Sequence, residues 1–175
     1  LAEYLNEGLQ DHLQTFSGSG AVGESIDRLR RFISFNRFFN PGSAFAAGEF
    51  LVAERLSESP KSAAARLGPA IDANSLLLAG LSAPYAPALA ASTFREILSG
   101  QLTDGRVPLS RRFGRAGTSE VTTGRSMMPI GSLVALKLYL ATGDLELLAW
   151  AFPRLRLWNE WWLNDRGDGQ PWRDG

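Results

Sequence analysis

The sequence lacks cysteine and carries no net charge. Without cysteine there is no disulfide and no thiol chemistry, and the cellular compartment stays open. The 18 basic residues balance the 18 acidic ones, so no net field favours a nucleic acid or a membrane surface as a partner. The longest apolar runs, such as residues 132–141 with Lys137 inside them, are far shorter than the roughly 18 residues of a membrane span. We therefore expect neither a nucleic-acid nor a membrane partner.

Several chemical signatures are also missing. The one histidine, His12, stands beside Leu13 in a helical pattern, where we expect it at the surface or lightly buried. The sequence shows no quartet of metal-ligand residues, no glycine-rich phosphate loop and no Ser/His/Asp order. Metal-dependent, nucleotide-dependent and triad chemistry are thus not indicated.

The chain does contain apolar residues at helical spacing along most of its length. These stripes predict amphipathic helices, over residues 1–16, 24–39, 43–56, 61–67, 74–81, 87–99, 132–141 and 145–151, with a further helix starting at Pro153. Gly100 fits a helix terminator, Asp144 an N-cap, and Pro153 a first turn. No run alternates with period two for long enough to predict a strand. The predicted fold class is all-α.

Residues 100–175 carry a recognisable order of motifs. They open GQLTDGRVP, continue through RSMMPIGS into a helix, and then reach TGD and FPRLRLWNEWWL. This order resembles glycoside hydrolase family 63 and its bacterial relatives, which are (α/α)6 barrels, and the resemblance covers residues 71–175. A complete toroid needs twelve helices of roughly 11 to 12 residues. We therefore interpret residues 1–175 as a single α-helical segment of a longer catalytic domain, with the rest of that domain as a partner.

Asp104 is the first candidate for catalysis. In the family that the chain resembles, the Asp of the DG turn is the general acid, and residues 104–108 read DGRVP. This chemistry requires a carboxyl that is neutral at working pH, opposite a second carboxylate that activates water. The alternative is an ordinary surface β-turn. The family's general base is a Glu that we expect beyond residue 175.

Two departures from the family pattern bear on activity. Ala73 and Asn74 stand where relatives show Trp-Asp, so the substrate-binding candidate Asn74 keeps hydrogen-bonding capacity and loses charge. Met127 and Met128 stand where Gln-Pro is commoner. The resemblance implies an inverting hydrolase of an α-linked glucoside or related glycan. The alternative is a helical carbohydrate-binding or structural protein without catalysis.

The aromatic residues suggest two roles. Trp158, Trp161 and Trp162 share a helical face, which favours a place in the core over a sugar platform. Trp172 follows a proline in a loop and is the better candidate for stacking on a sugar, with Arg173 and Asp174 as hydrogen-bonding partners of hydroxyl groups.

Two charged segments remain. Arg106, Arg111, Arg112 and Arg115 form a basic cluster that either binds an anionic sugar or is a solvated loop, and Arg106 is our candidate from it for substrate binding. Residues 164–170 have spaced acidic residues without the regular spacing of an EF-hand. We expect no metal and no cofactor, with calcium near this loop as the weaker alternative, since relatives in the family can carry it.

Overall fold

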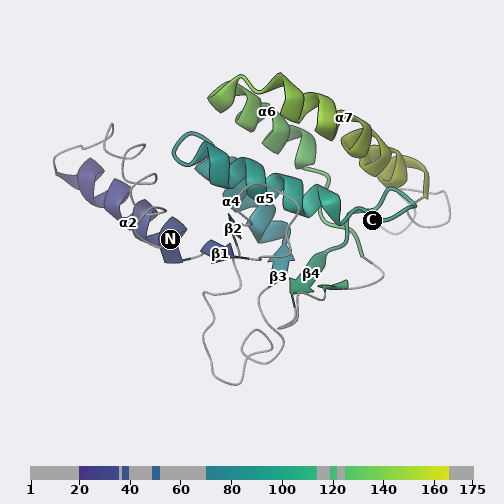
Figure 1. Ribbon diagram of the computed structural model, residues 1–175, viewed down its shortest axis with the longest axis horizontal. Helices are drawn as coiled ribbons and strands as arrows, with labels where there is room; N and C mark the ends of the chain where they lie inside the picture. Colours follow the sequence, from purple (N-terminus) through teal and green to yellow (C-terminus); the bar gives the residue numbers. More distant parts are fainter. Residues whose placement is uncertain are drawn as a thin grey trace.

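The computed structural model describes residues 20–35, 37–39, 49–51, 70–113, 119–121 and 125–165 (Figure 1). Most of them are helical, which confirms the all-α fold class. The helices are α2 (Ala21–Phe35), α4 (Ala73–Ser82), α5 (Pro87–Ser99), α6 (Gly131–Thr142) and α7 (Leu145–Glu160), which runs into the π-helical η2 (Trp161–Asp165). The strands are β1 (Arg37–Phe39), β2 (Glu49–Leu51), β3 (Ala70–Asp72), β4 (Ser110–Phe113) and β5 (Ser119–Val121).

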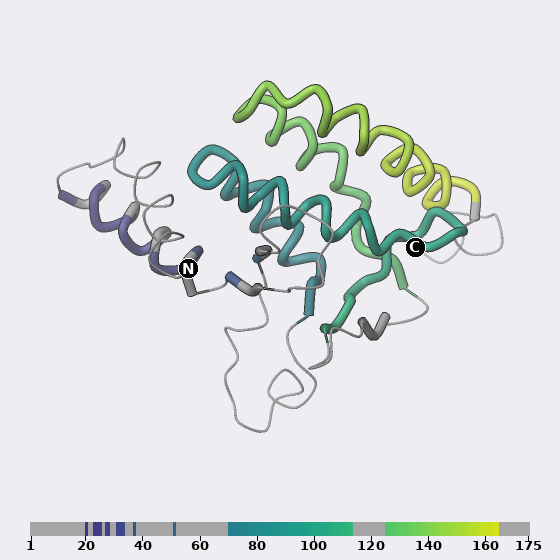
Figure 2. Tube along the Cα trace, viewed as in Figure 1, coloured from purple at the N-terminus to yellow at the C-terminus, as the bar shows by residue number. Residues whose placement is uncertain are grey.

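Two helical hairpins form the body of the described chain. Short connections join α4 to α5 and α6 to α7, and the two hairpins pack on each other, as the ribbon and the tube both show (Figures 1 and 2). One core lies between them, and its largest fully buried side chains include Leu76, Phe94, Leu98, Met127, Leu138, Leu147 and Trp158. None of the helices in the described ranges is both long and apolar enough to cross a membrane.

The helix ends follow simple capping chemistry. Asp72 caps α4, because its Oδ1 accepts hydrogen bonds from the backbone N–H of Asn74 at 2.9 Å and of Ser75 at 3.0 Å. Asp144 caps α7 as predicted, since its Oδ1 accepts from the Leu147 N–H at 2.8 Å. Gly143 ends α6 with φ at +68°, a left-handed conformation that glycine adopts without strain. The predicted stop after Ser99 is also confirmed.

The prediction for Pro153 is wrong. Pro153 lies inside the continuous helix α7 rather than in the first turn of a new one. An interior proline removes one helical hydrogen bond and usually kinks or breaks a helix. Here the proline is exposed, while Ala151, Leu155 and Trp158 keep the opposite face buried. Burial of that face on both sides of the proline offsets the lost hydrogen bond.

The described residues also include short strands, although no run of the sequence alternates long enough to predict one. The helix predicted over residues 24–39 ends at Phe35, and that over residues 43–56 is replaced in part by a strand, because β1 and β2 pair with Phe38 opposite Phe50. The Leu51 N–H also donates to Thr93 Oγ1 at 2.9 Å, which ties β2 to α5. The helices predicted over residues 1–16 and 61–67 lie outside the described residues.

A second sheet takes two of its three strands from the segment between the helices predicted over residues 87–99 and 132–141. Its strand order is β3-β4-β5, and all its pairs are antiparallel. Ile71 lies opposite Arg111, and Arg112 lies opposite Glu120. The sheet thereby connects the start of α4 with the chain that leaves the turn after α5.

Candidate active site

The turn over residues 101–107 is closed by its own hydrogen bonds. The Gly105 N–H donates to the Leu102 carbonyl at 3.0 Å, and the Leu102 N–H donates to the Arg106 carbonyl at 2.8 Å. The Asp104 side chain accepts from the Arg106 N–H at 2.9 Å. These bonds hold the Asp104 carboxyl at the tip of the turn, where its side chain is 45% exposed.

Gly105 holds this turn against α7. Its φ is +90°, and a Cβ added there would meet the Leu157 carbonyl oxygen at 2.6 Å. The residue must therefore be glycine both for its backbone conformation and for lack of space. The close neighbour that the structure shows at Gly105 is the backbone of α7; a close approach of this glycine to substrate, as the DG turn suggests, stays a prediction.

Gln101 fastens the same turn from the side, and sequence reasoning missed it. Its Nε2 donates to the Gly105 carbonyl at 2.7 Å and to the Arg154 carbonyl of α7 at 2.8 Å. One amide group thus bridges the turn and the helix behind it. The only signal in the sequence is a glutamine directly after the helix terminator Gly100, and that signal alone does not indicate a role.

Arg106 lies beside the candidate acid. Its Nη2 is 3.3 Å from Asp104 Oδ2, and its side chain is 22% exposed. Its Cζ lies 5.8 Å from the ring centroid of Trp161, within the range of a cation–π contact. The structure therefore brings together two of the predicted site residues, Asp104 and Arg106, and adds Trp161 to them.

The three helical tryptophans differ from one another. Trp158 is buried as predicted, and its Nε1 donates to Ser126 Oγ at 2.9 Å. Trp162 packs against the edge of the core and donates from Nε1 to the Met127 carbonyl at 3.2 Å. Trp161 is not among the residues of the described core, is partly buried and contacts Arg106. The core prediction is therefore wrong for Trp161, which is the first residue of η2.

The segment around Met127 runs along the chain that leaves the turn. The Met127 N–H donates to the Val107 carbonyl at 2.9 Å, and the Ser126 hydroxyl donates to the same carbonyl at 3.0 Å. The Met127 side chain is buried in the core, whereas Met128 is exposed. Met127 therefore contributes its side chain to the core next to the turn, and this side chain is not positioned to contact a ligand.

Asn74 lies in the first turn of α4 with its side chain exposed. Its Nδ2 donates to Asp72 Oδ2 at 3.4 Å, so the amide supports the helix cap. Because a short connection folds α5 back along α4, the start of α4 and the turn after α5 share one end of that hairpin. Asn74 is thus on the same end as Asp104, although its hydrogen bond here goes to its own helix cap.

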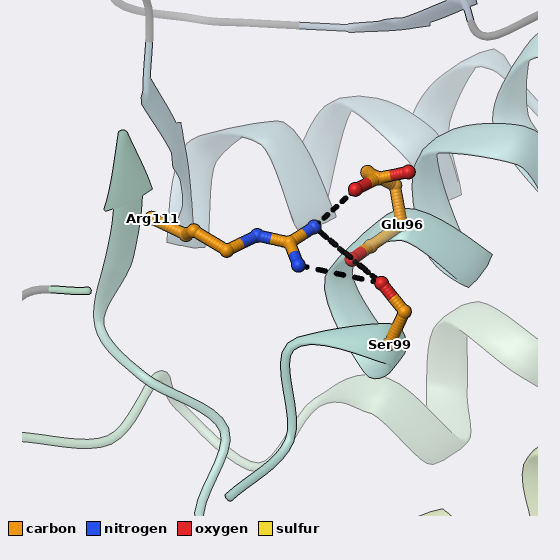
Figure 3. A network of polar contacts seen from close by, with 3 residues as sticks. All are labelled: Glu96, Ser99 and Arg111. Atoms are coloured by element: carbon orange, nitrogen blue, oxygen red, sulfur yellow. Dashed lines mark hydrogen bonds and ion pairs between the residues drawn. The ribbon is translucent and has the colours of Figure 1, made fainter. Parts of the chain in front are cut away.

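Arg111 is not available for an anionic sugar. Its guanidinium forms an ion pair with Glu96, donates to the Glu96 carbonyl at 2.6 Å and lies 3.4 Å from Ser99 Oγ (Figure 3). Burial lowers the pKa of Arg111 from its usual value, while the charge of Glu96 and its hydrogen bond act in the opposite direction. The pair joins β4 to the end of α5, directly before the turn.

The positions of the remaining predicted substrate-binding residues relative to the turn are not described. Trp172, Arg173, Asp174, Arg115 and residues 166–170 of the suggested calcium loop lie outside the described residues. In the part of the chain that is described, no group of three or more His, Cys, Asp or Glu side chains could hold a metal ion. The prediction of no metal or cofactor, with calcium near that loop as the weaker alternative, is thus untested there.

Two hollows flank α7. A cleft of about 460 Å³ lies beside the turn and is lined by Gln101, Leu102, Trp150, Arg154 and Leu157 among others. A wider groove of about 1010 Å³ lies between α6 and α7 and is mostly apolar, with Leu136, Leu148 and Phe152 in its lining. No residue of the turn lines the wider groove. The larger of the two hollows is therefore not the one next to the turn that carries Asp104.

Comparison with known proteins adds one match. The family model of the mannosylglycerate hydrolase MGH1-like glycoside hydrolase domain matches residues 71–175, more than half of the chain. The match contains both helical hairpins and the turn with Asp104, and it confirms the resemblance to family 63. No curated protein and no solved structure matches the chain.

Proposed function

The chain belongs to the MGH1-like glycoside hydrolase family, and we propose that it is part of an inverting hydrolase of an α-linked glucoside or related glycan. Membership supports a glycosidase function and a carbohydrate substrate in general. The inverting mechanism and the choice of sugar are our proposal. The observation that carries it is the Asp104 carboxyl, held at an exposed tip by a turn that is fixed on α7.

Asp104 acts as the general acid in this proposal. It donates its proton to the glycosidic oxygen as the bond to the anomeric carbon breaks. A second carboxylate, roughly 6.5 to 9.5 Å away in an inverting enzyme, removes a proton from the attacking water. We assign that base to a glutamate of the catalytic domain beyond residue 175. Asp104 then regains a proton from solvent.

We further propose that the two hairpins belong to an (α/α)6 toroid. The apolar groove between α6 and α7 supports this, because residues such as Leu136, Leu145 and Phe152 are exposed there. Neighbouring large apolar side chains that are exposed together are typical of a surface that another element covers. Helices of the remaining catalytic domain are the proposed cover.

A second function is a carbohydrate-binding protein without catalysis. Asn74 favours it, because it stands where relatives carry a charged Asp that holds the sugar hydroxyl groups, and loss of that charge would impair catalysis. Met127 no longer favours it, since its side chain is part of the core. The complete DGRVP turn favours the hydrolase.

The test is hydrolysis of α-glucosides and α-mannosides, followed by NMR of the first-formed anomer. Mannosides belong in the panel because the family model is named after a mannosylglycerate hydrolase. The protein to use is the catalytic domain that contains this chain. An inverting hydrolase releases the β-anomer from an α-glycoside, whereas release of the α-anomer would contradict inversion. Sugar binding without hydrolysis would support the second function.

A further inference from the structure

The peptide group between Gly105 and Arg106 is hydrogen-bonded on both of its sides. Its carbonyl oxygen, from Gly105, accepts from Gln101 Nε2 at 2.7 Å. Its N–H, from Arg106, donates to Asp104 Oδ1 at 2.9 Å. Because a peptide group is planar and rigid, the position of the carbonyl determines the direction of the N–H. Gln101 is thus connected to the candidate acid through a single peptide group.

The other end of this chain of hydrogen bonds lies on α7. Gln101 Nε2 also donates to the Arg154 carbonyl at 2.8 Å, so both hydrogens of the amide are used. Arg154 is 53 residues further along the chain, in the helix whose Leu157 carbonyl faces Gly105. The bonds therefore run in one order, from the helix carbonyl to the glutamine amide, the peptide group and the carboxyl.

The Gly105 carbonyl depends on this amide. Gly105 is buried, and a buried backbone carbonyl requires a hydrogen-bond partner. Gln101 supplies it. Hydrogen bonds in a chain also polarise one another, by roughly 10 to 30% per bond. The bond from Gln101 therefore both holds the peptide group and strengthens the N–H that Asp104 uses.

The orientation of the carboxyl matters because a proton donor must lie within hydrogen-bonding distance of the oxygen that it protonates. The Asp104 side chain is 45% exposed at the tip of the turn. Contacts with the turn must therefore provide its orientation. An error of about 1 Å in the position of a catalytic group can reduce the rate about 100-fold.

Resting on the proposed function of Asp104, we propose that Gln101 is a positioning residue for the general acid. Gln101 exchanges no proton. It holds the peptide group between Gly105 and Arg106 against α7, and this group directs the Asp104 carboxyl to the glycosidic oxygen. The proton then passes from Asp104 to that oxygen as the bond to the anomeric carbon breaks.

Residue 106 contacts both oxygens of the carboxyl. Its backbone N–H contacts Oδ1, and its guanidinium Nη2 lies 3.3 Å from Oδ2. The hydrogen bond from Gln101 bears on the backbone contact alone, because it acts on the peptide group. Substitution of Gln101 therefore tests the orientation of Asp104 without removing a charge from the site.

The experiment compares two leaving groups that differ in their need for a proton donor. The substrates are methyl and dinitrophenyl α-glucosides and α-mannosides, and the protein is the catalytic domain that contains this chain. Methanol leaves only with a proton from a general acid, whereas dinitrophenolate leaves as the anion. Gln101→Met keeps the length of the side chain and removes both N–H groups. It should lower kcat on the methyl glycosides by about 10-fold to 100-fold and leave kcat on the dinitrophenyl glycosides close to that of the wild type.

Three further variants make the comparison specific. Gln101→Glu keeps the shape but directs a carboxylate at two carbonyl oxygens, so it should lose more on the methyl glycosides than Gln101→Met. Asp104→Asn should show the same dependence on the leaving group with a larger loss. Asn159→Leu is the matched control, because it removes an amide of α7 that donates to Ser132 Oγ at 3.4 Å on the side of the apolar groove. It should keep the rates of the wild type on both substrates.

Unchanged rates in Gln101→Met would overturn the inference. An equal loss on both leaving groups would also overturn it, since Gln101 would then support the fold and not the acid. A loss in Asp104→Asn that does not depend on the leaving group would contradict the proposed function instead.

NMR of the isotope-labelled catalytic domain gives a measurement that does not depend on turnover. The Arg106 amide proton reports its hydrogen bond to Asp104. Gln101→Met should move this resonance upfield and speed its exchange with solvent by about 10-fold, and Asn159→Leu should leave it unchanged. An Arg106 amide that does not respond to Gln101→Met would overturn the inference even if glycosides are hydrolysed. A response without hydrolysis of any glycoside by the wild type would contradict the proposed function and confirm the connection of Gln101 to Asp104.

Discussion

The turn that carries Asp104 and the groove between α6 and α7 are built in opposite ways. The turn is closed by backbone hydrogen bonds, fastened to α7 by Gln101 and seated where only glycine fits at position 105. The groove exposes large apolar side chains such as Leu136 and Phe152. Both use the same helix α7, from its two sides.

The two regions differ in how far the described residues complete them. The turn is held by contacts among those residues, whereas the groove leaves large apolar side chains exposed. Among the described residues, most contacts that hold the turn come from the segment 96–161. The apolar groove requires a cover to remove its surface from water. We therefore expect the turn to be sensitive to single substitutions and the groove to tolerate polar ones.

The largest loss of stability should follow from Arg111→Met. The Glu96 side chain is 6% exposed and the Arg111 side chain 13%, and removal of one partner leaves a buried charge, which costs about 3 to 5 kcal/mol. Arg156→Met is the matched control on the groove side, because its pair with Glu160 is exposed. Urea unfolding measures both, and equal losses in the two variants would contradict the contrast.

A double variant, Glu96→Met with Arg111→Met, sharpens this result. Replacement of a whole buried pair by apolar residues is often neutral or stabilising. The double variant should therefore recover most of the loss of the single one. A double variant as unstable as Arg111→Met would mean that the arginine acts through its shape or its bonds to Ser99 rather than through charge.

Gly105→Ala should cost roughly 2 to 4 kcal/mol, because it adds a close contact to an unfavourable backbone conformation. The Cβ would lie 2.6 Å from the Leu157 carbonyl oxygen. Gly143→Ala is the matched control, since Gly143 also has positive φ but no atom within 4 Å of the added Cβ. That variant should lose only about 1 kcal/mol. Thermal unfolding compares them, and a similar loss in both would remove the argument for a tight contact with α7.

Polar substitution in the groove should have the smallest effect on folding. Leu136→Gln with Phe152→Gln should change stability by less than about 0.5 kcal/mol, because both side chains are exposed. The same change should reduce self-association of the 175-residue chain, measured by sedimentation velocity. Leu81→Gln is the control, because Leu81 is exposed on α4 outside this groove. Unchanged self-association of the double variant would show that the chains do not associate through the groove.

The sequence predicts the helical part of this fold well where periodicity is long. The apolar stripes over residues 74–81, 87–99 and 132–141 correspond to α4, α5 and α6, and the cap at Asp144 is correct. The strands could not be predicted, because runs of three or four residues are too short to show alternation. The prediction that Pro153 begins a helix failed for another reason. The burial of one face of α7 outweighs the tendency of proline to interrupt a helix.

The candidate site was predicted in part. Asp104 and Arg106 follow from the DGRVP motif, and the structure places them in contact. Gln101 and Trp161 were missed as site residues, because their contacts join segments about 50 residues apart in the chain. Helical periodicity assigns Trp161 to the core, whereas in the structure Trp161 lies at the start of η2 and contacts Arg106. Long-range placement of this kind has no local signature in a single sequence.

The most direct test of the account compares Asp104→Asn with Asp144→Asn in the catalytic domain that contains this chain. Asn at position 104 keeps an acceptor for the Arg106 N–H but has no acidic proton, so turnover should fall by roughly 10² to 10⁴ while the melting temperature stays near that of the wild type. Asn at position 144 remains a good helix cap, so turnover should be retained. Near-normal hydrolysis of an unactivated glycoside by Asp104→Asn would contradict the role of Asp104 as general acid.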